Sequence, residues 1–154
     1  MQTCIKILIN HNNNCREPIL RTFEQLPKED LTKDLGVGRG SIRDILVHLM
    51  NAEKYWISVL SDESFDFVDP KSFNDIPSIR SKWCEIEDRT IEFLEELKED
   101  ELIHVRNVSW KKGTVSFTIA KALIHMATHE THHRGLLVGL ARQLGLKPPD
   151  VNML

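Results

Sequence analysis

Residues 119–144 read IAKALIHMATHETHHRGLLVGLARQL, and this stretch decides the fold. It contains no proline, and its apolar residues recur every three to four positions along the chain. They form one stripe, made of Ile119, Leu123, Met126, Leu137, Leu140, Ala141 and Leu144. This periodicity predicts a long amphipathic helix that buries one face against the rest of the protein.

Four of the seven histidines lie in this predicted helix. At about 100° per residue, His133 falls within roughly 20° of the centre of the apolar stripe and His129 within roughly 60°. His125 and His132 lie roughly 100–120° away from it. His129 and His133 therefore face inward one turn apart, a spacing at which two imidazoles can reach one metal ion. The alternative is that both are hydrogen-bonded core residues, which requires a buried partner for each.

Length and composition indicate an ordinary globular domain spanning residues 1–154. Hydrophobic residues make up 41% of the chain and charged residues 28%, which is typical of a water-soluble protein with a hydrophobic core. The formal net charge of −3 and the lack of a dense Lys/Arg run argue against nucleic acid or an anionic membrane as partner.

The expected compartment is the cytoplasm. No apolar run reaches the roughly 18 residues of a membrane helix, and the N-terminus turns polar too early for a signal peptide. The three cysteines, Cys4, Cys15 and Cys84, are odd in number and widely spaced, which favours reduced thiols over a disulfide framework. Cys15 is interpreted as a small buried residue, with a nucleophilic role as the alternative.

Apolar spacing predicts three more helices, over residues 5–26, 42–60 and 76–97. Ser41 is the expected N-cap of the second, with Asp44 at the capping-box position. In the first, Pro18 predicts either a kink or the start of a separate helix. The polar residues before it, His11, Asn13 and Asn14, face either a polar cavity or solvent.

The connections between the helices differ in length. Residues 61–74 form a loop whose Phe65, Phe67 and Phe73 are expected to pin it to the core or to roof a pocket. Residues 105–117 predict a small hairpin or an extended link. The glycine-rich GVGRG at 36–40 lacks the Lys-Ser/Thr of a phosphate loop. We therefore predict an all-α fold, a four-helix bundle with a long loop and a short hairpin-like link between helices.

His48 is the third histidine expected to face inward, because it flanks the apolar stripe of helix 42–60. Bundles build metal sites from facing helices, so His48 can meet His129 and His133. Three neutral imidazoles suit Zn²⁺, Ni²⁺ or another divalent transition metal. Three protein ligands leave a coordination position open, as in catalytic sites. Glu130 also faces inward, and it is expected to pair with Arg16, Asn13 or a ligand histidine unless it escapes at an edge of the bundle.

Several segments resemble the DinB/YfiT-like metalloproteins. HMATHETHHRGLL (125–137) with the downstream RQLGLKPPD resembles their last helix, SIRDILVHLMNAEKYW (41–56) their second, and HNNN…ILRTFEQLP their first. The resemblance implies a bundle with a three-histidine metal site, often dimeric. By position the ligands are His48, His129 and His133, whereas His132 stands where relatives also have Tyr and is not expected to bind. Many relatives have Gln at the position of Leu136, so altered contacts to the ligands or altered helix packing are expected there, without loss of the ligands.

The resemblance also implies an activity. The best understood branches are thiol transferases and isomerases that use bacillithiol or mycothiol, in which the metal lowers the pKa of the thiol. The expected function is therefore a metal-dependent thiol S-transferase acting on small electrophiles, as a cytoplasmic homodimer. The alternatives are a metal-dependent hydrolase that uses metal-bound water, and a non-catalytic metal-binding stress protein.

Overall fold

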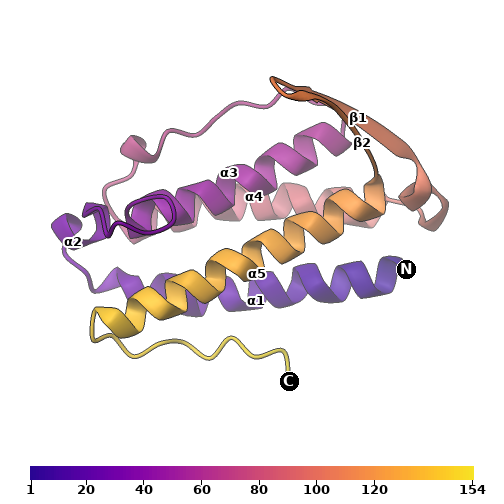
Figure 1. The fold of residues 1–154 in the computed structure, drawn as a ribbon. Coiled ribbons are helices and arrows are strands. Elements are labelled where there is room, and N and C mark those ends of the chain that lie inside the picture. Colours follow the sequence, from indigo (N-terminus) through magenta and orange to yellow (C-terminus); the bar gives the residue numbers. More distant parts are fainter.

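Four long helices form the body of the protein (Figure 1). The computed structural model describes residues 1–154. Its long helices are α1 (Gln2–Glu24), α3 (Ile42–Leu60), α4 (Ile76–Glu96) and α5 (Ile119–Gln143). Helices α1 and α3 each pack against both α4 and α5. The prediction of an all-α four-helix bundle is confirmed.

Shorter elements connect the helices: α2 (Lys28–Thr32), the 3-10 turns η1 (Pro70–Ser72) and η2 (Glu99–Ile103), and strands β1 (Val105–Trp110) and β2 (Gly113–Thr118). The strands pair antiparallel from Val105↔Thr118 to Trp110↔Gly113, so the link is a hairpin and not an extended segment. Helix α2 was not predicted. It forms because Leu31 has a buried position on the bundle.

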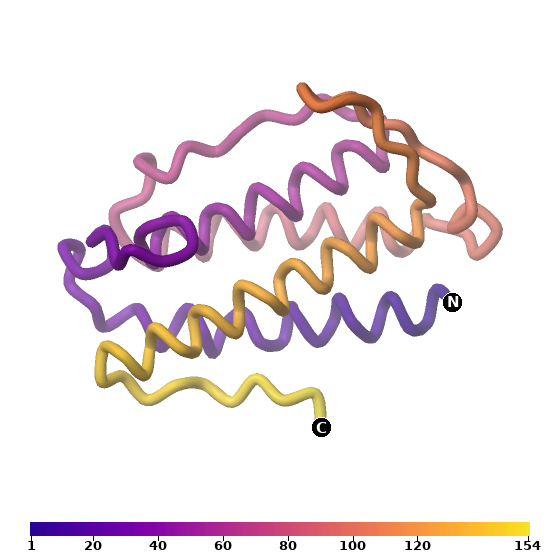
Figure 2. The backbone as a smooth tube through the Cα atoms, viewed as in Figure 1, coloured from indigo at the N-terminus to yellow at the C-terminus, as the bar shows by residue number.

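The long loop between α3 and α4 has a geometric cause. Helices α3 and α4 begin at the same end of the bundle, so residues 61–75 must return along its length (Figure 2). At 1.5 Å per residue, α3 is roughly 28 Å long, which a tight turn cannot span. Asn51 anchors the loop, since its side chain bonds both the N–H and the C=O of Val68, at 2.9 and 2.8 Å. Phe73 is buried in the core.

Side-chain caps fix the starts of three helices. The hydroxyl of Ser41 accepts the N–H of Asp44 at 3.1 Å, the carboxylate of Asp75 accepts the N–H of Ser78 at 2.8 Å, and Thr118 opens α5 in the same way. Helix α1 continues through Pro18, so no separate helix begins there.

The core is divided by a layer of polar side chains. One apolar cluster lies at the end of the bundle where α3 begins, and a second at the end where α1 begins. Polar residues on all four helices separate the two clusters in sequence, and we call them the polar layer. Asn12, Arg16, Glu53, Thr90 and Arg134 are buried, and Glu130 is partly buried. No helix is long and apolar enough to cross a membrane.

Candidate metal centre

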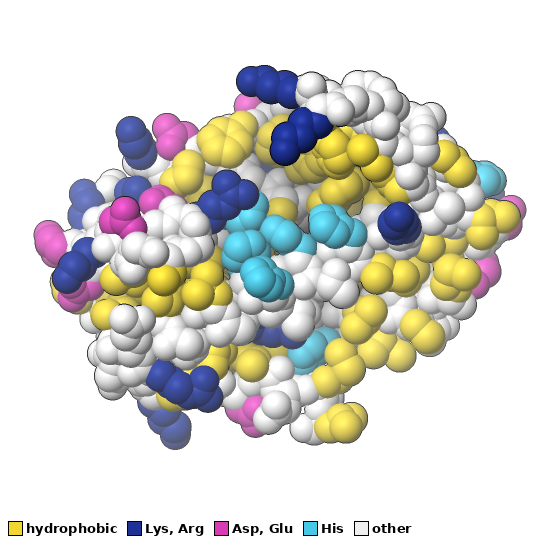
Figure 3. All heavy atoms as spheres, viewed as in Figure 1, with side chains coloured by type: hydrophobic (Ala, Val, Ile, Leu, Met, Phe, Trp, Pro, Cys, Tyr) yellow, Lys and Arg dark blue, Asp and Glu magenta, His cyan; other side chains and the backbone are white.

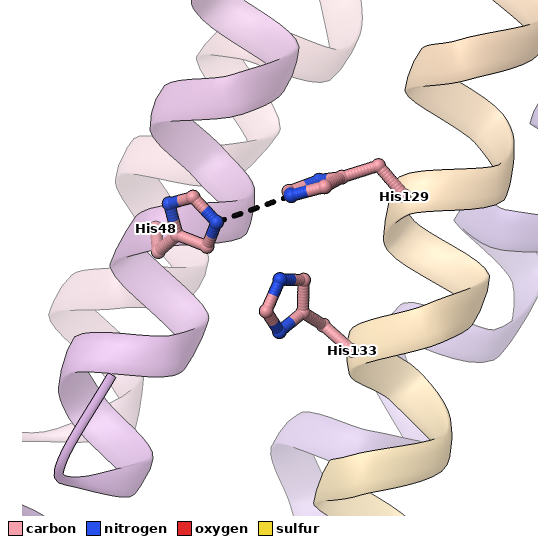
Figure 4. A group of neighbouring side chains, drawn as sticks. All are labelled: His48, His129 and His133. Atoms are coloured by element: carbon pink, nitrogen blue, oxygen red, sulfur yellow. Dashed lines mark hydrogen bonds between the residues drawn. The ribbon is translucent and has the colours of Figure 1, made fainter. Parts of the chain in front are cut away.

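Three histidines from two helices meet at one point. His48 on α3 faces His129 and His133 on α5 (Figure 4). One ring nitrogen of each lies within 4.8 Å of the others. The Nε2 atoms of His48 and His129 are 3.1 Å apart, and the ring centroids of His129 and His133 are 4.6 Å apart. The predicted convergence of these side chains is therefore present in the structure.

The group lies at the surface and not in the bundle core. Figure 3 shows histidine side chains gathered on one open face of the molecule. The three histidines are partly buried, whereas His125 and His132 are exposed. The apolar stripe predicted a deeper position for His133. The buried face of α5 is instead shared with the polar layer, including Arg134 with 5% exposure, and this turns His133 toward the seam with α3.

The electrostatic surroundings keep these imidazoles neutral. Burial, followed by the positive charges of Arg39 and the neighbouring histidines, lowers the pKa of His48 to about 4. Burial and His133 do the same for His129, whose pKa is also about 4. The pKa of His133 is lowered by burial and by His132. Every charged group that shifts these pKa values is cationic, and neutral imidazole is the form that binds metal.

The three side chains could hold a divalent ion. The Nδ1 atom of His133 is buried and has no hydrogen-bond partner, which is costly unless another ligand satisfies it. Nitrogens that share one ion tetrahedrally at about 2.0–2.1 Å lie roughly 3.4 Å apart, close to the observed 3.1 Å between His48 and His129. This three-histidine group could therefore bind a metal ion, and that it does so stays a prediction.

A polar hollow of about 260 Å³ adjoins His48. Its lining includes Arg39 and Phe67. Phe67 therefore borders a pocket, which is one of the two roles predicted for the aromatic residues of the loop. Arg39 is exposed and takes part in no salt bridge, whereas Asp44 in the same hollow pairs with Arg43 at 2.9 Å. A cation without a partner therefore stands beside the histidines.

Leu136 supports the loop that carries Arg39. A Cβ atom added to Gly38 would lie 2.6 Å from the Cδ2 atom of Leu136, and the φ of Gly38 is +59°. The loop thus rests directly on α5 at the position where many relatives were expected to have Gln. Whether these contacts differ from those of relatives with Gln stays a prediction.

The carboxylate of Glu130 pairs with Arg16, which was one of the three partners predicted for it. The Arg16 guanidinium lies 2.9 Å from the carboxylates of Glu130 and Glu53 and 2.7 Å from that of Glu87. Burial alone would lower the pKa of Arg16, but these carboxylates outweigh it and raise the pKa. Trp83 covers the guanidinium, with 4.5 Å between its ring centroid and the central carbon.

The polar residues His11, Asn13 and Asn14 of α1, which were predicted to face either a polar cavity or solvent, do not share one environment. Asn14 faces solvent, whereas His11 and Asn13 are partly buried. Cys15 is buried, its sulfur lies 3.5 Å from a ring nitrogen of His11, and burial raises its pKa. A raised pKa disfavours the thiolate, so the small buried residue is the better interpretation of Cys15.

Four residues of the polar layer were not predicted from the sequence: Asn12, Glu53, Thr90 and Arg134. Asn12 donates to the carbonyl of Ala127 and accepts from Arg134, at 2.9 and 2.6 Å. Glu53 accepts hydrogen bonds from Trp83 and Thr90, both at 2.8 Å. Glu53 follows the apolar Leu49 by one helical turn, so a carboxylate on the inward face was the signal that could have revealed it.

The helix bundle and the histidine group together define the class of the protein: it is a four-helix protein with a candidate metal centre between two helices. The chain belongs to the DinB family, whose family model matches residues 1–154. It is 30% identical over 148 residues to the uncharacterized protein YizA of Bacillus subtilis (strain 168), covering 94% of this chain and 90% of YizA. It is 23% identical over 147 residues to Protein DinB of the same organism, covering 90% and 84%.

Solved structures share the fold. A DinB-like protein from Bacillus cereus ATCC 10987 superposes with a TM-score of 0.71 at 19% identity, over 89% of this chain and 90% of that one. The DinB-like protein YjoA from Bacillus subtilis gives 0.69 at 17% identity, over 94% and 96%. At these identities the likeness concerns the fold alone.

Proposed function

We propose that this protein is a metal-dependent thiol S-transferase that acts on small electrophiles. The observation that carries the proposal is the convergence of His48, His129 and His133, held neutral at an open face of the bundle. In this proposal the three imidazoles bind Zn²⁺ or Ni²⁺ and leave a coordination position free. A divalent ion held there would supply a thiolate at neutral pH by lowering the pKa of a bound thiol.

The surroundings of the histidines favour a thiol over water as the nucleophile. Hydrolysis by a metal site commonly uses a nearby carboxylate as general base. The charged groups that lower the pKa values of the three imidazoles are Arg39 and other histidines. Asp44, which shares a hollow with His48, is held by Arg43. A thiolate needs no general base for its attack, so it suits this environment better.

Arg39 supports a low-molecular-weight thiol that carries an anionic group. Its guanidinium has no carboxylate partner in the protein and lines the hollow beside His48. Guanidinium groups bind carboxylates and phosphates in a bidentate manner. In the proposed complex Arg39 binds the anionic end of the thiol while its sulfur lies at the histidines. Bacillithiol is the type of cosubstrate that the family resemblance implies.

The direct test combines metal analysis with a transfer assay. The purified protein is loaded with Zn²⁺ or Ni²⁺ and mixed with bacillithiol and 1-chloro-2,4-dinitrobenzene. In the reaction a carbon–sulfur bond forms, the carbon–chlorine bond breaks, chloride leaves, and the thiol proton passes to solvent. We expect the protein to raise the rate of adduct formation and His129→Ala to abolish the increase.

Other outcomes would select the alternatives. Ester hydrolysis without thiol dependence would indicate a hydrolase. Stoichiometric metal with neither thiol binding nor turnover would indicate a non-catalytic metal-binding stress protein. Cysteine in place of bacillithiol serves as the control for nonspecific thiol reactivity.

We also propose that the protein acts in the cytoplasm and as a homodimer. Three free cysteines support a reducing compartment. The resemblance to a family that is often dimeric supports a partner of the same chain. Light scattering at micromolar concentration tests the dimer, and a monomeric mass would contradict it.

A further inference from the structure

An apolar hollow lies under the hairpin, close to the histidines. Its volume is about 180 Å³. The residues that line it come from α3, both strands and α5, and they include Trp56, Trp110, Val115, Phe117 and His125. Figure 3 shows hydrophobic side chains gathered beside the histidines on the same open face. Trp110 and Val115 are 46% and 44% exposed, so this wall of the hollow is accessible from solvent.

Aromatic rings hold one another in place around this hollow. Trp56 makes edge-to-face contacts with Trp110, Phe117 and His125, at centroid distances of 6.4, 5.4 and 5.2 Å. The indole N–H of Trp110 donates to the hydroxyl of Tyr55 at 2.8 Å. Because this bond uses the one polar atom of the Trp110 indole, that ring contributes an apolar surface to the hollow, whose lining also includes Lys121 and His125.

The hollow and the metal centre are joined through α5. His125 lies one turn before His129, and their ring centroids are 6.0 Å apart. His125 is also part of the lining of the hollow. A small molecule whose reactive carbon lies at the histidines can therefore extend its remaining atoms under the hairpin. On the other side of the histidines, Arg39 and Phe67 border the polar hollow.

We propose that the apolar hollow binds an aromatic or compact apolar group of the electrophile, next to its reactive carbon. This inference rests on the proposed transferase function and names its substrate class. The volume is comparable with the roughly 150 Å³ of a protein cavity known to hold benzene. The hairpin then selects the electrophile, and the polar hollow beside Arg39 receives the thiol.

The hollow can be tested without the chemistry. Benzyl alcohol is titrated into the protein with and without Zn²⁺ while the three indole N–H signals are followed by ¹H–¹⁵N NMR. Trp56 and Trp110 line the hollow and should shift. Trp83 is buried and bonded to Glu53, so its signal should stay in place. Absence of a saturable shift at Trp56 and Trp110 would overturn the proposal.

Two variants on the hairpin link the hollow to specificity. Val115→Glu places a carboxylate in the apolar lining, and Val105→Glu is the matched control, because Val105 is 58% exposed and outside the lining. We expect Val115→Glu to weaken benzyl alcohol binding at least tenfold and Val105→Glu to leave it unchanged. Circular dichroism verifies that both variants are folded.

Kinetics separates this inference from the proposed function. Val115→Glu should lower kcat/KM at least tenfold for 1-chloro-2,4-dinitrobenzene and spare the small polar electrophile iodoacetamide. An equal loss for both electrophiles would refute a role in specificity. If the unaltered protein transfers thiol to neither, the proposed function fails, and the NMR titration alone decides whether the hollow binds apolar groups.

Discussion

The guanidinium of Arg16 lies 2.9 Å from the carboxylate of Glu53 in the middle of the bundle, where the two side chains are only 6% and 3% exposed. Arg16 is the one cation that pairs with Glu53, whereas Arg16 itself also pairs with Glu87 and Glu130. Glu53 also accepts hydrogen bonds from Trp83 and Thr90, so both of its oxygens have protein partners. A pair of this kind adds little net stability, but loss of one member leaves an uncompensated buried charge.

Replacing Arg16 with Met should therefore lower the free energy of unfolding by about 3–5 kcal/mol. The carboxylate of Glu53 would remain buried without its cation. Arg21→Met is the matched control, since Arg21 is 73% exposed and pairs only with Glu17 on its own helix. The control should cost at most about 1 kcal/mol. Urea unfolding followed by circular dichroism measures both, and equal losses would disprove the role of the buried charge.

Replacing His133 with Ala should abolish tight metal binding, whereas His132→Ala should change it little. The two residues are adjacent but differ by about 100° in direction on the helix. His133 lies in the three-histidine group, and His132 is exposed outside it. Two remaining imidazoles are too few to hold a divalent ion in an open site. Metal stoichiometry of the purified variants is the readout, and the reverse pattern would refute the ligand assignment.

Cys15 should resist alkylation in the folded protein. It is 4% exposed, and burial raises the pKa of its thiol, so both access and thiolate content are low. Cys4 and Cys84 are exposed. Iodoacetamide at pH 8 should give two adducts by mass spectrometry, and a third only after denaturant is added. Preferential labelling of Cys15 would restore the nucleophile interpretation.

The cap of α4 should make stability depend on acidic pH. The backbone N–H of Ser78 lowers the pKa of Asp75 below its ordinary value of 3.8. A lowered pKa means that the cap stabilises the fold above pH 3.8 and that this contribution is lost as pH falls through the folded-state pKa. Asp75→Ala should cost about 1 kcal/mol at pH 7, and less below pH 4.

Asp75→Asn is the control for this cap, because an amide oxygen accepts the same hydrogen bond without titrating. The stability difference between Asp75→Asn and Asp75→Ala should therefore stay constant between pH 7 and 3. Thermal unfolding measured across this range provides the data. A pH-independent cost of Asp75→Ala would contradict the assignment.

Residue patterns revealed the helices and the three histidines because both depend on local spacing. Ser41 and the period of residues 119–144 act within one helix. The position of His48 beside the apolar stripe of helix 42–60, together with the bundle architecture, predicted the distant partner. The polar layer was harder to predict, since Asn12, Glu53 and Thr90 are satisfied by residues far away in sequence. Their burial is decided by tertiary contacts that no local period encodes.

The spacing of residues along the sequence also could not predict how deeply the histidine group is buried. The apolar residues of α5 predicted a central position for His133. Part of the inward face is instead occupied by Glu130, which pairs with Arg16, and by Arg134, which donates a hydrogen bond to Asn12. The hollow under the hairpin is lined by residues from four elements, so neither the amino-acid composition nor the spacing of apolar residues predicts it.

The position of the histidines along the chain has a consequence for how the protein would fold with metal. His48 and His129 are 81 residues apart, and α4 and the hairpin lie between them. An ion that joined them would bind the folded protein and not the unfolded chain, and it would stabilise the fold by that difference in affinity. Because the ligands meet only after α3 and α5 have packed, uptake of the ion would follow folding and then slow the separation of these two helices.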